Sequence, residues 1–484
     1  WMTQHRSDLV ENLQSEGLYY VDLLDAGDLA SDPINTEDIW VSFDFSGRDL
    51  SGNIILTRNA DDAVLAGSFS KYTHYVPFYR YCGSENSGLM EGTWLAMRRT
   101  LTLGDTYFRN NKDRLGITSP EVTLRYGSKI RLYMPSSVVG NGVEGTGGYE
   151  GQEGYSLSSK RPFIVTMEIR DTVSNPLERE GTDVDDFCEL NGGLQIYSKG
   201  DDDTPATEVP EDPEDPEHPY NETSKRWVSA CDSIPQVYVN VRYNPAEPRD
   251  QLSFPAPYHV GYEPYVSEAS VRDIDMQIAE ALKKRFHGEG DDYQKYEGVK
   301  ALEADSVTLD GTAKIWYIGR FLDGFIFDTN IDEVKKIIYG EVAQKGTALD
   351  YTPSSGGMIQ AFYYTIPNLK FGQWAELITT STNAYGSSGK SGSSSSSTSG
   401  SSGYSSSYLD YLNYLNYANS YYGSGGYYGG YYGGYYGNYY GGYYDSMYGY
   451  GYDSSSTGTT VTTITTEIPS FTPLIFQLYI EPED

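Results

Sequence analysis

The sequence is poor in the side chains that bind metal ions or form covalent cross-links. Its 484 residues include three cysteines, Cys82, Cys188 and Cys231, and five histidines. No two cysteines are close enough for a CxxC motif, which argues against a zinc site, and an odd number of thiols does not build a disulfide framework. Cys188 and Cys231 flank an acidic segment and could pair, but isolated buried thiols are the preferred interpretation. The histidines fit no catalytic triad or metal spacing, so no metal or cofactor is expected.

Basic residues and long apolar runs are also scarce. The 68 acidic residues outnumber 35 basic ones and give a net charge of −33. Because contacts with phosphates require lysine or arginine, this balance disfavours nucleic acid as a partner. No apolar run reaches the roughly 18 residues of a membrane-spanning helix, so no transmembrane span is predicted. The chain starts at Trp1 without a basic and then apolar leader, which indicates an intracellular protein or a processed product.

Alternating apolar and polar residues dominate the first third of the chain. Residues 1–35 predict an amphipathic helix from Ser7, with Gly17 as its stop, and then a strand at 18–21. Further half-buried strands are predicted within residues 36–175, at 38–47, 129–134 and 162–169.

Residues 176–265 predict an acidic, proline-rich linker with some strand. Residues 201–218 hold too little apolar surface to offset the entropy of ordering, so a solvated segment is expected there. A calcium site is the alternative interpretation, but the acids lack the order and the glycine of an EF-hand loop. Residues 236–243 nevertheless read as a strand, so part of this connector folds.

The last part of the chain, residues 266–484, predicts a second folded domain. Val271, Ile274, Ile278, Leu282 and Phe286 recur at helical spacing and predict a helix over 270–286. Residues 319–330 predict two strands joined by a two-residue Asp-Gly turn, because that pair suits positive φ angles.

Several short motifs follow this hairpin in a fixed order. They are Gly357 to Phe362, Phe371-Gly372-Gln373, Asn383 to Gly386, Ile468-Pro469 and Leu474-Ile475-Phe476. Their order and most of their spacing resemble the FKBP family of peptidyl-prolyl isomerases, over roughly residues 313–480 with one interruption between 386 and 467. The resemblance implies an α+β fold with two FKBP-like domains, each a curved antiparallel sheet wrapped on a short helix. The first of these, within 36–175, is the more divergent copy.

The resemblance also implies which residues form an isomerase pocket in the second domain. The catalytic set provides aromatic walls, a carboxylate beside Tyr317, a backbone donor at Ile359 and a tyrosine hydroxyl for the substrate carbonyl. Its members are Tyr317, Phe327, Asp328, Ile359 and Tyr385. The substrate-binding set completes the walls, base and rim: Leu349, Met358, Phe362, Ile468 and Phe476. Phe362 stands where many members of the family carry tryptophan.

The first domain departs from this pattern. Phe45-Ser46-Gly47 replaces the strand end that carries the tyrosine, residues 52–57 lack the Phe-Asp pair, and residues 135–140 lack the second tyrosine. A structural or binding role, without catalysis, is therefore expected for residues 36–175.

An unusual insertion occupies residues 387–466 of the second domain. It is rich in serine and glycine and then in Tyr-Tyr-Gly-Gly units. One interpretation is a flexible low-complexity segment. The other is an adhesive surface, because tyrosine offers a large contact area at a low cost in side-chain entropy.

Two functions remain open at this level. The first is a prolyl isomerase that acts on proline-containing, exported or outer-membrane polypeptides. The second is a non-catalytic accessory subunit of an outer-membrane protein complex, which docks through residues 387–466. The chain resembles tandem FKBP-like lipoproteins of Bacteroidota envelopes, which implies an extracytoplasmic protein at the outer membrane or cell surface, anchored by a lipidated cysteine upstream of Trp1.

Overall fold

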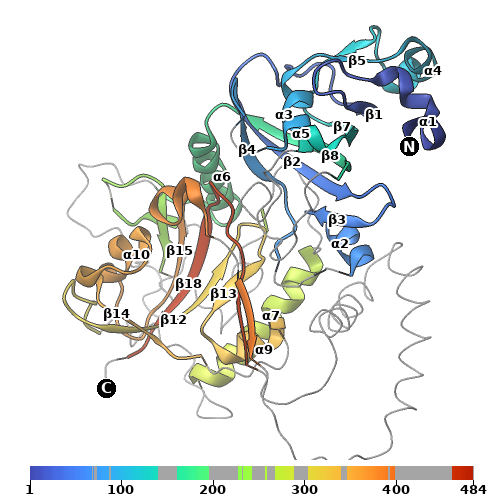
Figure 1. Ribbon diagram of the computed structural model, residues 1–484. Helices are drawn as coiled ribbons and strands as arrows, with labels where there is room; N and C mark the ends of the chain where they lie inside the picture. Colours follow the sequence, from blue (N-terminus) through green and yellow to red (C-terminus); the bar gives the residue numbers. More distant parts are fainter. Residues whose placement is uncertain are drawn as a thin grey trace, which may run out of the picture. The chain divides into compact units, whose positions relative to one another are not determined.

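The computed structural model describes most of the chain. The described residues are 1–67, 69, 73–86, 89–139, 161–195, 227–231, 233–241, 257–258, 268–287, 304–339, 346–390, 393–397 and 461–482. The chain divides into two compact units (Figure 1), the first ending at Pro176 and the second beginning at Leu177. Both combine helices with largely antiparallel sheets, so the predicted α+β class is confirmed. Within the described residues, no helix is long and apolar enough to cross a bilayer.

The first unit is built on a six-stranded sheet with the order β1-β7-β8-β2-β3, and β4 also pairs with β2. The strands are β1 (Tyr20–Ala26), β2 (Ile39–Arg48), β3 (Ile54–Thr57), β4 (Phe78–Cys82), β7 (Ser128–Met134) and β8 (Phe163–Val173). A small separate ladder joins β5 (Leu101–Thr102) to β6 (Glu121–Val122). The helices are α1 (Met2–His5), α2 (Ala60–Ala66), α3 (Glu91–Arg98), α4 (Asp105–Leu115) and α5 (Ser136–Val139).

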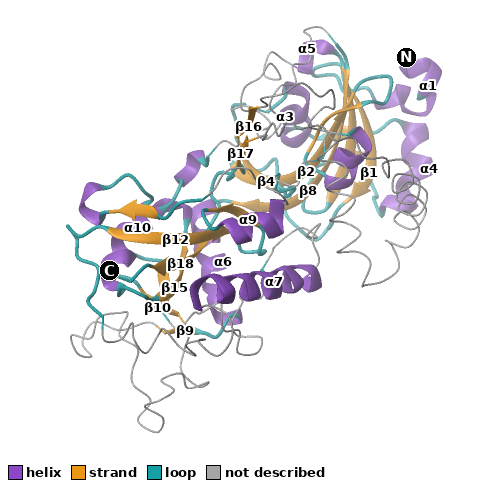
Figure 2. Ribbon diagram, turned by 90° about the horizontal axis from the view of Figure 1, so that it is seen from below, coloured by secondary structure: helices purple, strands orange, loops and turns teal. Residues whose placement is uncertain are grey.

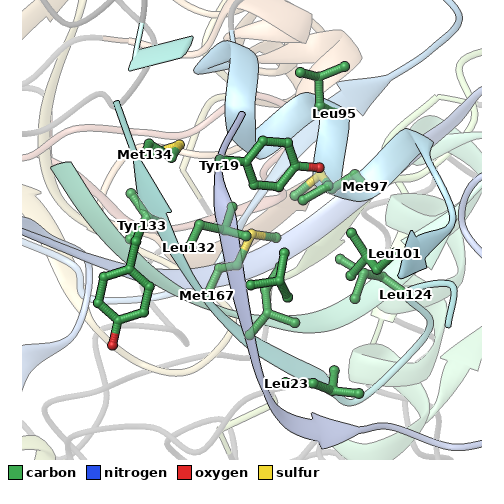
Figure 3. Packing of buried hydrophobic residues seen from close by; sticks show 14 of the residues in the cluster. Tyr19, Leu23, Leu95, Met97, Leu101, Leu124, Leu132, Tyr133, Met134 and Met167 are labelled. Carbon is green, nitrogen blue, oxygen red and sulfur yellow. The ribbon is translucent and has the colours of Figure 1, made fainter. Parts of the chain in front are cut away.

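The core of the first unit lies between its sheet and these helices (Figure 3). Leu132 and Met167 from adjacent strands meet Leu95 and Met97 of α3, and all are buried. Alternating residues predicted strands within 38–47, 129–134 and 162–169. The apolar residues of that pattern thus face inward on β2, β7 and β8.

The helix predicted from Ser7 to Gly17 is shorter than expected. A 3-10 helix, η1 (Ser7–Asn12), follows α1, and the chain then turns through Gly17 at φ +77° and Leu18 at φ +54°. The buried Asn12 side chain donates to the carbonyl of Val21 and accepts from the N–H of Gly104. These long-range bonds replace the continuing helical ones.

The second unit contains an eight-stranded sheet with the order β13-β12-β18-β15-β11-β10-β9, and β14 also pairs with β12. Its strands are β9 (Leu194–Gln195), β10 (Trp227–Ser229), β11 (Val237–Asn240), β12 (Ala313–Arg320), β13 (Ile326–Thr329), β14 (Leu349–Tyr351), β15 (Trp374–Thr379) and β18 (Leu474–Ile480). Its helices are α6 (Pro176–Leu190), α7 (Glu268–His287), α9 (Asp332–Tyr339) and α10 (Gln360–Thr365). Short 3-10 turns are η5 (Pro353–Ser355), η6 (Ile366–Asn368), η7 (Ser381–Asn383) and η8 (Gly386–Ser388).

Part of the predicted linker belongs to this second unit. The helix α6 was not expected from the sequence. Its residues Val184, Phe187 and Cys188 are buried against the sheet. Their partners are Trp227, Tyr238, Ile378 and Ile475. The predicted strand near 236–243 is β11, which pairs with β15. The acidic run at 201–218 lies outside the described residues.

The turn between β12 and β13 has three residues and not two. Phe321 and Phe325 form the closing pair, since the Phe321 N–H donates to the Phe325 carbonyl at 2.9 Å. The Gly324 N–H donates to the Phe321 carbonyl at 3.0 Å, and Gly324 has φ +89°. This is the type I turn with a glycine bulge that three-residue hairpin loops favour. Only the glycine of the Asp-Gly pair takes positive φ, so the predicted two-residue turn was wrong.

The two units share strand order and register. In the first unit Gly47 of β2 pairs with Val165 of β8, which pairs in turn with Leu132 of β7. In the second unit Gly319 of β12 pairs with Phe476 of β18, which pairs with Leu377 of β15. Both hairpins also carry a register shift directly after the glycine. Residues on the strands that the two sheets share can therefore be matched by register, whereas β10 and β9 have no counterpart in the first sheet.

The outer face of the second unit's sheet is covered by helices. Ile278 and Leu282 of α7, with Val334 of α9, pack against Trp316, Trp374 and Tyr479 of the sheet. Figure 2 shows α7 and α9 near each other on this unit. The counterparts of those three aromatic residues in the first unit are Asp44, Lys129 and Glu168, by register. They form ion pairs there, so the same sheet face is apolar in one unit and charged in the other.

Candidate functional site

Three phenylalanines from three elements meet on the inner face of the second unit's sheet. The ring centroids of Phe327 (β13) and Phe476 (β18) are 5.7 Å apart at 86°, and those of Phe362 (α10) and Phe476 are 5.1 Å apart at 81°. Such edge-to-face pairs are favourable because the positive ring edge meets the negative face. Phe476 thus lies at the centre of an aromatic wall, which we call the Phe476 cluster: Phe327, Phe362 and Phe476.

Gly319 makes room for this cluster. A Cβ atom at Gly319 would lie 2.6 Å from Cζ of Phe327, closer than side chains tolerate. The absence of a side chain at this point of β12 lets the Phe327 ring lie directly on the strand.

A hydrogen-bonded pair borders the cluster. The Tyr317 hydroxyl donates to Oδ2 of Asp328 at 2.9 Å, and both side chains are half-buried. The backbone N–H of Tyr317 donates to Oδ1 of Asn330 at 2.8 Å, which fixes the strand beneath the ring. The Tyr317 and Phe476 ring centroids are 6.5 Å apart, so the pair adjoins the aromatic wall.

Ile359 begins α10 with its backbone still extended, at φ −58° and ψ 147°. Its side chain is buried in the same core as the Phe476 cluster, and its carbonyl accepts from the Phe362 N–H. Within the described part of the chain, the structure shows no hydrogen bond from the Ile359 N–H. Met358, one residue earlier, is 36% exposed and lies outside that core.

Tyr385 lies in the turn between β15 and the insertion. It is half-buried and packs at the edge of the same core, and the ammonium of Lys390 lies 5.4 Å from its ring centroid. Lys390 and Ile468 exchange backbone hydrogen bonds of 2.7 and 2.8 Å, which closes the base of the insertion. The register of this bridge continues through β16 (Ser393–Ser397) and β17 (Val461–Thr465).

Most of the predicted site residues therefore lie on one core. The structure brings together eight of the ten at or against it: Tyr317, Phe327, Leu349, Ile359, Phe362, Tyr385, Ile468 and Phe476. Asp328 joins them through Tyr317, whereas Met358 is at the surface.

Sequence reasoning missed two aromatic neighbours of the cluster. The Phe321 and Phe327 rings are 5.1 Å apart, and the Tyr351 and Phe362 rings are 6.0 Å apart. Tyr351 follows Leu349 by two residues on β14, and this period-two spacing could have placed both on one sheet face. Burial raises the pKa of the Tyr351 hydroxyl, with a smaller contribution from Tyr363, so this phenol stays protonated at neutral pH.

The equivalent place in the first unit is built differently. The residues that correspond by register to Tyr317, Asp328 and Phe476 are Phe45, Leu56 and Val165. A Cβ at Gly47 would lie 2.3 Å from Cζ of Phe163, so a buried phenylalanine from β8 covers the glycine.

The polar side chains of that region point to α2. Ser46 hydrogen-bonds to Thr57 and Asp62, and Asp62 also pairs with Arg48 at 2.9 Å. The first unit thus has neither the tyrosine–aspartate pair nor the Phe476 cluster. In the described ranges of either unit, no group of three or more His, Cys, Asp or Glu side chains could hold a metal ion.

No protein-family model and no curated protein matches the chain. Solved structures that align with it include FKBP domains. The three FKBP domains of wheat FKBP73 align at 9% identity over 96% of this chain and 95% of that one, with a TM-score of 0.19. A peptidyl-prolyl isomerase of Pseudomonas syringae pv. tomato aligns at 14% identity over 37% and 65%, with a TM-score of 0.16. The N-terminal domain of FKBP42 from Arabidopsis thaliana aligns at 4% identity over 32% and 85%, with a TM-score of 0.20. TM-scores this low carry no argument about function. The function proposed below is argued from the side chains described above.

Proposed function

We propose that the chain consists of two FKBP-like domains and that the second is a peptidyl-prolyl isomerase for proline-containing polypeptides. The observation that carries the proposal is the Phe476 cluster, bordered by the hydrogen bond from Tyr317 to Asp328. Sequence motifs that resemble the FKBP family supply these residues.

This arrangement suits the chemistry of proline isomerisation. The barrier of about 18–20 kcal/mol comes from amide resonance, so no nucleophile, metal or cofactor is required. A catalyst lowers it by binding the twisted amide better than the planar one. An aromatic wall takes the proline ring out of water, and fixed donors stabilise the carbonyl as it rotates. The Ile359 N–H and the Tyr385 hydroxyl are the donors assigned to that carbonyl.

The Tyr317–Asp328 pair supplies the negative charge of the site. The hydrogen bond from Tyr317 keeps this carboxylate in place beside the aromatic wall. The apolar residues Leu349, Met358 and Ile468 are assigned to the sides of the bound peptide.

The test is prolyl-isomerase activity of the full chain on a blocked proline tetrapeptide. A Tyr385→Phe, Asp328→Ala double variant is expected to lose about 100-fold in kcat/KM, the usual cost of removing a transition-state donor. The matched control is Tyr126→Phe, Asp113→Ala, which makes the same two changes at exposed positions of the first unit. Equal activity in the two double variants would refute the assignment of the pocket.

A second function, an accessory subunit, is favoured by one observation. The ladder β16–β17 leads from Ile468 at the pocket into residues 398–460, so the insertion departs from the rim of the site. Those residues lie outside the described ones. In this proposal the insertion docks on an outer-membrane protein complex at the cell surface, with the chain anchored through a lipidated cysteine upstream of Trp1. Isolation of the native protein from membranes, with and without residues 398–460, tests it: equal recovery of partners would exclude docking through the insertion.

A further inference from the structure

The buried carboxyl of Glu180 lies apart from the proposed pocket but contacts the segment that leads to it. Glu180 is on α6 and is 2% exposed. Its Oε2 accepts from the Ser381 hydroxyl at 2.8 Å and from the Ser381 N–H at 3.2 Å. Its Oε1 is buried and has no hydrogen-bond partner among the described residues.

Ser381 begins the turn that carries Tyr385. The Ala384 N–H donates to the Ser381 carbonyl at 2.9 Å, so the contact with Glu180 fixes the start of η7 and the direction in which Tyr385 leaves it. Three residues lie between Ser381 and Tyr385, and the N–H groups of Asn383 and Ala384 both donate to carbonyls of this turn. A shift at Ser381 would therefore move Tyr385.

Close packing holds α6 at this junction. A Cβ at Gly181 would lie 2.0 Å from Nε2 of Gln236, so the helix lies directly on the start of β11. The Gln236 carbonyl in turn accepts from the Thr380 N–H at 3.4 Å. Helix α6, β11 and the end of β15 thus meet around the Glu180 carboxyl.

We propose that Glu180 is a positioning residue for Tyr385: through the two hydrogen bonds from Ser381, its buried carboxyl holds the Ser381–Tyr385 turn in the closed, binding-competent arrangement. This inference rests on the proposed isomerase function only in so far as Tyr385 serves catalysis. The hold on the turn is a property of the fold and can be measured without activity.

The dependence on pH follows from burial. Burial raises the pKa of Glu180 to about 7 from 4.5, while the hydrogen bonds from Ser381 oppose the rise and the charge of Asp183 adds to it. Ser381 on η7 and Gln236 on β11 do not titrate. Burial in the closed arrangement outweighs the Ser381 hydrogen bonds, which favour the ionised carboxylate, so the closed arrangement raises the pKa of Glu180 overall. For an opening that exposes Glu180 to water, the closed arrangement is therefore favoured at low pH and is lost as pH rises through about 7. If opening returns Glu180 fully to water, the opening equilibrium shifts about tenfold between pH 6 and pH 8.

The experiment uses the full chain and two substitutions of Glu180. Glu180→Gln is a fixed neutral analogue of the protonated acid, and Glu180→Ala removes the contact. The matched control is Glu178→Gln, an exposed residue on the same helix. Hydrogen exchange of residues 380–386 is measured at pH 6 and pH 8, with times scaled to the intrinsic rates, and kcat/KM for a blocked proline tetrapeptide is measured alongside.

The expected result is specific to each variant. Wild type and Glu178→Gln lose up to about tenfold in protection from pH 6 to pH 8. Glu180→Gln keeps the pH 6 protection at both pH values, and Glu180→Ala has low protection at both. A purely structural role would lower stability in both Glu180 variants without making the Gln variant independent of pH.

The outcomes separate this inference from the proposed function. Unaltered protection and an unaltered pH profile in Glu180→Gln and Glu180→Ala would overturn the inference and leave an active pocket in place. The expected protection pattern in a chain that isomerises no proline peptide would support the hold on the turn and refute the isomerase. A kcat/KM that falls from pH 6 to pH 8 in wild type but not in Glu180→Gln supports both.

Discussion

The two units share a pattern of strand pairing but carry different side chains on both faces of the sheet. On the inner face, Gly319 is covered by the phenylalanine of the neighbouring hairpin strand, Phe327, whereas Gly47 is covered by Phe163 from β8. In the second unit the aromatic rings therefore gather at Phe476, next to the Tyr317–Asp328 pair. Both sheets keep the glycine and its register, whereas the aromatic cluster forms only where the hairpin strand supplies the ring that covers the glycine.

The outer faces differ as strongly. The second unit buries Trp316, Trp374 and Tyr479 under α7, while the first carries Asp44, Lys129 and Glu168 at the same register positions. A cross-strand ladder of ion pairs can face water, but a row of aromatic rings cannot without cost. The helix preceding the second sheet is therefore part of its fold.

Cysteine labelling can follow the two units separately. Cys82 in the first unit and Cys188 in the second are fully buried. Burial also raises the pKa of the Cys82 thiol to about 11, so little thiolate forms at pH 8. Mass spectrometry after labelling in increasing urea thus reports unfolding of each unit in one sample.

The largest contrast is expected between Trp374→Ala and Lys129→Ala. The Trp374 ring is 4.7 Å from Tyr479 and 5.4 Å from Phe286, and its loss opens a cavity that costs about 3–5 kcal/mol. Lys129 forms one half-exposed ion pair with Glu168, and its loss costs less than about 1 kcal/mol. Urea unfolding read at Cys188 and Cys82 measures both. Equal costs would show that α7 does not stabilise the second sheet.

A second contrast uses equivalent arginines. Arg320 pairs with Asp275 of α7 at 2.7 Å, with both side chains nearly fully buried, and Arg48 pairs with the more exposed Asp62. Asp275→Ala leaves a buried guanidinium without its counter-charge and is expected to cost about 3–5 kcal/mol. Asp62→Ala should cost about 1 kcal/mol.

Salt provides the control for this pair. Raising ionic strength should reduce the cost of Asp62→Ala and leave that of Asp275→Ala almost unchanged, because buried charges are poorly screened. An Asp275→Ala chain as stable as wild type would mean that the pair contributes nothing to the docking of α7.

A third contrast separates stability from activity. Alanine at Gly319 or Gly47 would collide with the Phe327 or Phe163 ring, and such overpacking costs about 1–3 kcal/mol in either unit. Only Gly319→Ala displaces a ring of the Phe476 cluster, so only this variant should lose isomerase activity. A loss of activity in Gly47→Ala would contradict the assignment of the first unit as non-catalytic.

Local patterns predicted the elements, and long-range contacts decided what the patterns left open. Period-two alternation found β2, β7, β8 and β11, and helical spacing found α7. The spacing of Val184, Phe187 and Cys188 could also have found α6, but acidic residues around them favoured a linker. The three-residue turn was missed because its closing pair is Phe321 and Phe325, two residues that periodicity alone assigns to the strands.

The residues of the candidate site also divide into those that the sequence predicted and those that only long-range contacts revealed. The resemblance of the motifs to the FKBP family implied the aromatic residues, and three of these, Phe327, Phe362 and Phe476, lie on β13, α10 and β18. Glu180 could not be predicted as a partner of Ser381, since the two are 201 residues apart and no local pattern links them.

The smallest contrast concerns a single hydroxyl. Tyr317→Phe removes the hydrogen bond to Asp328 and is expected to cost about 1 kcal/mol, while activity falls more than stability because the carboxylate loses its fixed direction. The reverse change, Phe45→Tyr, places a hydroxyl in the core of the first unit, where leucine stands at the aspartate's register position. That buried hydroxyl should cost about 1–3 kcal/mol and bring no activity. If Phe45→Tyr were neutral, the inner face of the first unit would hold a polar partner, and its role as an apolar, non-catalytic copy would have to be abandoned.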